Sequence, residues 1–265
     1  MKKLFSTLLM AALLLAMATP AQEIKQAKPK LPPRIELSCP LKPDPPPVVD
    51  GDNRDWERVP SSIPVTEKNV MWGKHNWKGE DDLSGTVSLC YDQNYLYLLV
   101  EVVDDKIVVD EGKLFYTDHI EFSFVPRLKE GIEGVISKDS LYVFGFTPGS
   151  PEKTGDPVLD VEACGNLVFP PNEPWEGVEV EASFTEDGYI LEARFPWKVF
   201  KVKQSEVKLG AVFGIDVHLS DSDNGPTQET LTSLNHLRPW KGRRWEDIPK
   251  VVLTGTDGKK PLPQK

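Results

Sequence analysis

The sequence predicts an all-β fold: an antiparallel β-sandwich of jelly-roll or immunoglobulin-like two-sheet architecture with long loops. Short apolar runs recur along the chain, and several alternate apolar with polar residues at the period of two that strands require. No apolar pattern of helical period lasts beyond a turn or two. At 265 residues, of which 39% are hydrophobic and 27% charged, the chain is long enough to build one sizeable core.

Residues 1–21 have the layout of a signal peptide. A short basic start is followed by an apolar stretch that is too brief to span a bilayer, and small residues precede Gln22. No later apolar run is long enough to cross a membrane, and no cysteine follows the leader before Cys39. We therefore expect a secreted or periplasmic protein with a cleaved signal peptide, no lipid anchor and no membrane span.

Composition narrows the range of partners. The net charge is −10, and cleavage of a leader that contains Lys2 and Lys3 lowers it to −12. An acidic protein repels nucleic acid and anionic membranes, so neither is expected as a partner, whereas a neutral or cationic ligand suits it. We expect a monomer. The three cysteines lack the close pairs of a zinc site; one disulfide, for which Cys39 and Cys164 are the suggested pair, is compatible with export.

In chain order, residues 22–47 contain eight prolines, which favour an extended leader or spacer. We expect the folded domain over 48–255, with Trp56 in its core, and a flexible tail over 256–265. Residues 95–103 are apolar nearly throughout, which predicts a central strand covered on both faces. The next strand alternates between Ile120, Phe122 and Phe124 on one side and His119, Glu121 and Ser123 on the other. Its polar face is where we expect function.

Further strands follow along the chain. Residues 178–184 and 189–195 alternate around the turn Thr185–Gly188 and predict a β-hairpin. The remaining expected strands are 141–146, 213–219 and 250–254, and residues 149–172, rich in glycine, proline and acid, are expected to form a long loop.

Six segments occur in a fixed order: VVDGDNRDW from Val48, LCYDQNYLYLLVEVVDD from Leu89, FYTDHIEFSF from Phe115, DGYILEARFPW from Asp187, GIDVHLSDSD from Gly214 and WEDIPKVVL from Trp245. In this order they resemble the family 9 carbohydrate-binding modules and the wider DOMON-like sandwiches, across almost the whole mature domain. The resemblance implies a module that holds a polysaccharide or oligosaccharide between aromatic rings, while polar side chains fix the hydroxyl groups.

The same resemblance implies particular site residues. The family's first ring falls at Phe115, where a tryptophan is usual, and its second ring falls at Trp245, whose charged neighbours predict an exposed side chain. The acid of the family's D-x-x-E strand falls at Glu121, with His119 on the same face. An arginine that family members can use on the next strand falls near Tyr142 here.

Catalysis is not expected. Asp118 and Glu121 are three residues apart on one strand, so their side chains point to opposite faces and cannot form a glycosidase pair. No nucleophile motif occurs, and the four histidines show no metal-ligand spacing. Three alternatives to a non-catalytic binding module remain: a glycan-processing accessory or enzyme component, a haem-binding redox sandwich, for which Met71 is the only methionine after the leader, and an envelope scaffold that has lost sugar binding.

For the binding module, the only cofactor that we consider is structural calcium. Asp50, Asp52 and Asp55 offer hard oxygen ligands in a turn, as do Asp221 and Asp223. Neither segment fits a twelve-residue calcium loop, because neither has the closing glutamate, and capping of the turns by the aspartates is the alternative. Family members often carry structural calcium. No other cofactor is expected.

Overall fold

The computed structural model describes residues 34–129, 131–137, 140–149, 158–160, 176–225, 227–235 and 243–260. These residues belong to one compact unit, Pro33–Lys265. The predicted signal peptide, the first part of the proline-rich segment and most of the predicted loop 149–172 lie outside the described residues. None of the helices in the described ranges combines the length and the apolar character that crossing a membrane requires.

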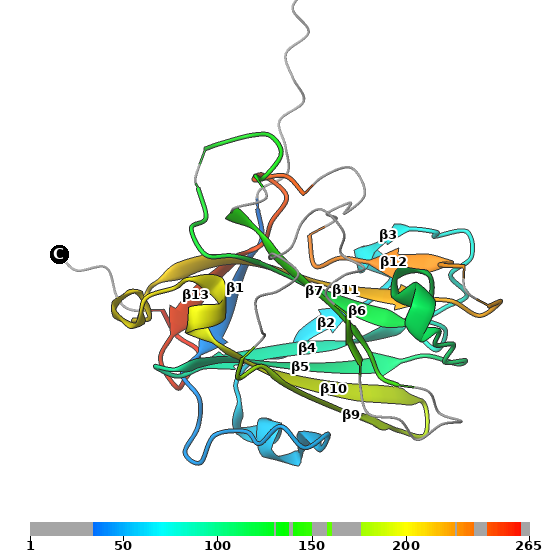
Figure 1. Cartoon of the computed structure of the whole chain (residues 1–265), viewed down its shortest axis with the longest axis horizontal. Coiled ribbons are helices and arrows are strands. Elements are labelled where there is room, and N and C mark those ends of the chain that lie inside the picture. Colours follow the sequence, from blue (N-terminus) through cyan, green and yellow to red (C-terminus); the bar gives the residue numbers. More distant parts are fainter. Residues whose placement is uncertain are drawn as a thin grey trace, which may run out of the picture. The chain divides into compact units, whose positions relative to one another are not determined.

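The larger of two sheets contains the strand with the predicted polar face (Figure 1). Antiparallel pairs connect its members, except that β1 and β13 run parallel. The strands follow the order β1 (Glu36–Pro40), β13 (Lys250–Thr254), β11 (Val212–Asp221), β6 (His119–Val125), β7 (Tyr142–Thr147) and β8 (Val158–Asp160), and β12 (Thr230–Thr232) pairs with both β11 and β3 (Val70–Trp72).

The smaller sheet contains the predicted central strand and hairpin. Its order is β2 (Ile63–Val65), β4 (Ser84–Tyr91), β5 (Tyr95–Val103), β10 (Gly188–Pro196) and β9 (Glu179–Phe184). The β9–β10 turn closes with a hydrogen bond from Thr185 N to Gly188 O at 2.9 Å. Gly188 has φ of +156°, and a Cβ there would lie 2.0 Å from Val102 O, so the turn requires glycine. Short 3-10 helices complete the fold: η1 (Asn53–Arg58), η2 (Glu67–Asn69), η3 (Glu111–Tyr116), η5 (Trp197–Phe200) and η6 (Gln204–Glu206).

Aromatic side chains from both sheets meet in the core. Phe122 of β6 stacks on Phe195 of β10 with ring centroids 4.9 Å apart, and Phe124 stacks on Phe200 at 3.9 Å. These rings are fully buried, and burial of apolar surface is the main favourable contribution to folding. The predicted all-β sandwich is confirmed, and Trp56 is buried as expected, in a smaller cluster against the smaller sheet.

The proline-rich segment extends less far than predicted. Glu36–Pro40, expected in the spacer, forms β1, and Pro40 ends the strand, where a missing N–H group is tolerated. Cys39 of β1 is a fully buried free thiol, so the suggested disulfide from Cys39 is wrong. At the other end, Lys260 forms an ion pair with Glu36, which joins the beginning of the predicted tail to the domain.

Candidate functional site

The outer face of the larger sheet carries a row of polar side chains. Strand alternation sends every second residue of β6 and β11 away from the core, and the register places His218 opposite Glu121 and Ser220 opposite His119. All of these side chains are buried. We call the following set the polar row: His119, Glu121, Ser123, Asp216, His218 and Ser220.

Arg243 reaches the polar row from a distant part of the chain. Its guanidinium forms an ion pair with Glu121, and its Nε donates to Ser123 Oγ at 2.9 Å. Arg243 is 3% exposed and Glu121 6%. Burial raises the pKa of Glu121, but Arg243, His119 and His218 together outweigh that effect and bring this pKa down to about 2. Glu121 is therefore charged at neutral pH and fixed by its cationic partner.

The two histidines of the polar row keep hydrogen-bonding capacity. His119 Nδ1 lies 2.7 Å from Thr117 O, while its Nε2 is 3.6 Å from Glu121, longer than a hydrogen bond. His218 Nε2 is likewise 3.6 Å from Asp216, and neither ring nitrogen of His218 has a hydrogen-bond partner among the described residues. Buried polar atoms are rarely left without partners, so these nitrogens mark a place suited to a polar ligand.

The two rings predicted to hold a sugar lie in one small apolar cluster. Trp245 packs there with Val143 and Ile248, and the half-buried Phe115 packs against the same cluster. Trp245 is only 6% exposed, contrary to the expectation of an exposed ring. Its charged neighbours Arg244 and Glu246 pair with each other, and the loop around Gly134 hydrogen-bonds to the Trp245 and Glu246 segment, so the ring is covered.

An exposed ring stands beside this cluster instead. Tyr116, the last residue of η3, is 59% exposed. Its neighbour Phe115 contacts His119 of the polar row edge to face, with ring centroids 5.1 Å apart. The beginning of β6 therefore combines an accessible aromatic side chain with the polar row.

Tyr142 does not share a face with Glu121. The register pairs Tyr142 of β7 with the core residue Phe124, and the Tyr142 ring lies edge-on to Phe200 inside the sandwich at 5.7 Å. The expectation that Tyr142 joins the site of Glu121 is therefore corrected by the strand register. The guanidinium near Glu121 comes from Arg243, which sequence reasoning did not assign.

The predicted metal ligands Asp50, Asp52 and Asp55 do not converge on one point. Asp52 caps η1 and pairs with Arg54, the Asp50 carboxylate accepts the Asp52 N–H at 3.1 Å, and Asp55 accepts the Val48 N–H at 2.6 Å. Each carboxylate serves its own local turn, which is the capping alternative.

The buried Glu192 anchors this segment. Its carboxylate accepts the N–H groups of Asp50 and Gly51 at 3.0 and 2.6 Å and the indole N–H of Trp56 at 2.6 Å.

Three other aspartates do converge, between the sheets at one end of the core. Asp104, Asp118 and Asp221 are buried, and their carboxylate oxygens lie within 4.8 Å of one another. Each lies two residues from the end of a row of core-facing apolar side chains. Asp104 follows the row of β5, Asp118 precedes the row of β6, and Asp221 follows the row of β11. We call them the inner trio. The buried Tyr189 hydroxyl has no hydrogen-bond partner among the described residues, and burial together with these three carboxylates raises its pKa.

The charges of the inner trio are poorly compensated. Burial, and after it repulsion from nearby carboxylates of both acidic clusters, raises the pKa of Asp104 to about 6, of Asp118 to about 9 and of Asp221 to about 8. Asp118 accepts the N–H groups of Val108 and Ser222, the latter at 2.7 Å, so its carboxyl group holds two backbone segments together. Clustered carboxylates and a hydroxyl, all hard oxygen donors, fit a calcium ion.

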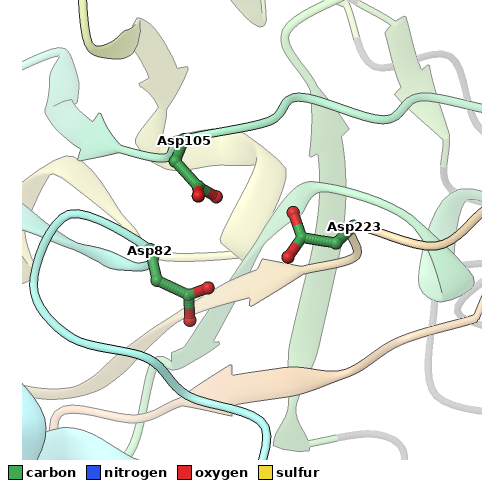
Figure 2. A group of neighbouring side chains, drawn as sticks. All are labelled: Asp82, Asp105 and Asp223. Atoms are coloured by element: carbon green, nitrogen blue, oxygen red, sulfur yellow. The ribbon is translucent and has the colours of Figure 1, made fainter.

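A second acidic cluster includes a lysine. Asp82, Asp105 and Asp223, which we call the outer trio, come from three different loops, and their carboxylates point toward a common space (Figure 2). Lys78 forms ion pairs with Asp82, at 3.0 Å, and with Asp223.

Comparison with known proteins identifies the family. The family described as "Carbohydrate family 9 binding domain-like" matches residues 49–251. The chain belongs to this family. The family 9 resemblance is therefore confirmed, and with it the class of function, carbohydrate binding by a module of non-catalytic type.

Individual relatives are distant from this family 9 domain. The exoglucanase XynX of Acetivibrio thermocellus is 24% identical over 214 residues, which cover 79% of this chain but only 16% of that protein. Two structures of a family 9 module from Caldicellulosiruptor kristjanssonii, with cellotriose and with glucose, superpose with TM-scores of 0.59 and 0.60. Their identities are 16% and 13%, and the matches cover 88% and 87% of this chain and 99% and 98% of theirs. These structures establish a shared fold.

Proposed function

We propose that this family 9 domain binds a neutral saccharide at the beginning of β6, with Phe115 and Tyr116 as the aromatic wall and the polar row as the source of hydrogen bonds. The observation that carries this proposal is the set of imidazole nitrogens of His119 and His218 that lack hydrogen-bond partners among the described residues, on the same face as Glu121. Hydroxyl groups both donate and accept, so they satisfy either ring nitrogen.

The chemistry of a pyranose suits this combination. One face of the sugar ring presents C–H groups that pack on an aromatic ring, while the rim hydroxyls seek polar partners. Because the polar row is buried, the proposal requires that its cover, which includes Arg243, moves to admit those hydroxyls. Burying about 100 Å² per ring contributes about 2.5 kcal/mol before the costs of association, which corresponds to micromolar to millimolar dissociation constants.

We further propose that the module acts without cleaving its ligand, as an exported monomer that serves a glycoside hydrolase system. Asp118 belongs to the core side of β6 and Glu121 to the outer side, so the two do not face one glycosidic bond. The acidic net charge favours neutral ligands over polyanions.

Tyr116→Ala is expected to weaken saccharide binding about tenfold, because it removes the exposed stacking surface. Calorimetric titration with cellotriose, glucose and a panel of soluble glucans and xylans measures this effect. Phe184→Ala is the matched control: this exposed ring lies on β9 of the other sheet and leaves affinity unchanged. Equal affinity of the Tyr116 variant and the unmodified protein contradicts the site. A blank panel for the unmodified protein favours the scaffold alternative, and new reducing ends favour an enzyme.

We also propose that the inner trio holds a structural calcium ion, with Tyr189 beside it. The ion offsets the repulsion among Asp104, Asp118 and Asp221 and joins β5, β6 and β11 at one end of the core. The calcium ion takes no part in binding the saccharide.

Calcium at about 100 times its dissociation constant is expected to stabilise the fold by about 2.7 kcal/mol, and Asp118→Asn is expected to abolish most of this effect. Thermal unfolding with calcium and with a chelator measures it. Asp50→Asn, at the site that the sequence suggested, serves as the control and keeps the full calcium effect. An Asp118→Asn protein that responds to calcium as strongly as the unmodified one contradicts the assignment.

A further inference from the structure

The outer trio already contains a cation. Lys78 Nζ lies 3.0 Å from Asp82 Oδ1 and forms an ion pair with Asp223 as well. The pKa of Lys78 is raised mainly by its hydrogen bond to Asp223 and, second, by its hydrogen bond to Asp82. The carboxylate oxygens of Asp82, Asp105 and Asp223 lie within 4.8 Å of one another, a spacing at which a divalent cation also binds (Figure 2). One ammonium group thus pairs with two of the three aspartates of the outer trio.

The loop before β4 fixes the position of this ammonium group. The Lys78 N–H donates to Asp82 Oδ2 at 2.9 Å, so backbone and side chain of the same lysine both contact Asp82. The indole N–H of Trp77 donates to Leu83 O at 2.9 Å, and Asp82 N–H donates to Gly79 O at 3.2 Å. These bonds close the loop around its own lysine, whose side chain is held at the outer trio although much of it faces solvent.

We propose that Lys78 is a built-in counter-ion, which occupies the outer trio in place of a second divalent cation and excludes such an ion from it. An ammonium group competes for the same carboxylate oxygens that a calcium ion needs at 2.3–2.6 Å. Because the lysine is tethered by its own loop, its effective concentration at the trio is high. The inference does not depend on the ion proposed for the inner trio.

The proximity of the two trios gives this arrangement a physical reason. Asp105 follows Asp104 directly and Asp223 lies two residues after Asp221, so two members of each trio come from the same two segments of the chain. Two divalent cations in such close sites repel each other strongly. The repulsion between one divalent cation and one ammonium group at the same separation is about half as large. Lys106 adds a second ammonium group, which donates to the Asp223 carbonyl oxygen.

Lys78→Met is expected to open the outer trio and to add one calcium ion per chain. Equilibrium dialysis of the purified protein at about millimolar calcium, the upper range for protein sites, counts bound ions. Lys74→Met is the matched control, because Lys74 is a comparably exposed lysine of the same loop that pairs with Glu67 at 2.9 Å, and it leaves the count unchanged. Lys78→Met with Asp105→Asn removes the added ion. An unchanged count in Lys78→Met overturns the inference.

The ion count separates this inference from the calcium proposed for the inner trio. A rise from one to two supports both, a rise from zero to one supports the counter-ion alone, and a count that stays at one supports the inner trio alone. A second variant tests the outer trio with Lys78 in place. Asp105→Asn by itself, at an exposed position, is expected to leave the number of bound calcium ions unchanged. Loss of an ion in that variant shows a divalent cation already in the outer trio and overturns the inference.

Discussion

Arg243→Met is expected to lower the free energy of unfolding by about 3–5 kcal/mol, because it leaves the buried carboxylate of Glu121 without its cationic partner. Urea unfolding measures the loss. The matched control is Arg127→Met, since Arg127 pairs with Glu206 at 3.1 Å on the exposed surface, where an ion pair contributes at most about 1 kcal/mol. A loss no larger than that of the control contradicts the role of Arg243.

The dependence of stability on pH gives a second measurement on this pair. The folded-state pKa of Glu121, about 2, lies below the unfolded value of about 4.3. The group's contribution is therefore fully present above pH of about 4.3 and is lost as the pH falls toward 2. Glu121→Gln removes this titration, so the stability of the variant falls less steeply than that of the unmodified protein over the same interval. Parallel curves contradict the low pKa.

Phe122→Ala is expected to cost about 3–5 kcal/mol, since it removes a fully buried ring at the centre of the aromatic core. Phe122 contacts Phe195 from the opposite sheet, so the cavity opens between the sheets, where the backbone is held on both sides. Chemical unfolding measures this loss. Phe184→Ala, at a ring that is 38% exposed on β9, is the control, with an expected change of at most about 1 kcal/mol. Similar losses for both variants contradict the assigned core.

Strands that are long and regularly patterned were predictable from the sequence. The alternation in β6, β10 and β11 shows which face of each strand points into the apolar core, and the apolar run of β5 shows that both of its faces are covered. β1, β2, β3, β8 and β12, none of which was predicted, have only three to five residues each. β1 depends on its pairing with β13, more than two hundred residues away, and local sequence does not encode such a contact.

The candidate site was predictable only where strand alternation determines it. Glu121 and His119 share a face because they are two residues apart on one strand. The burial of Trp245 depends on the loop around Gly134, and Arg243 approaches Glu121 from 122 residues away, so neither follows from local pattern. The inner trio did leave a signal, because Asp104, Asp118 and Asp221 each lie two residues from the nearest apolar residue of a core-facing row, and so on the same side of the strand.

The parallel pairing of β1 with β13 has a consequence during protein synthesis. Glu36–Pro40 leaves the ribosome early, but its partner Lys250–Thr254 is among the last parts of the domain to be made. Until then one edge of the larger sheet is open, and the core positions of Val251 and Leu253 are unfilled. The domain therefore completes its fold only after translation has passed residue 254, and a chain cut short before that strand exposes an edge prone to aggregation.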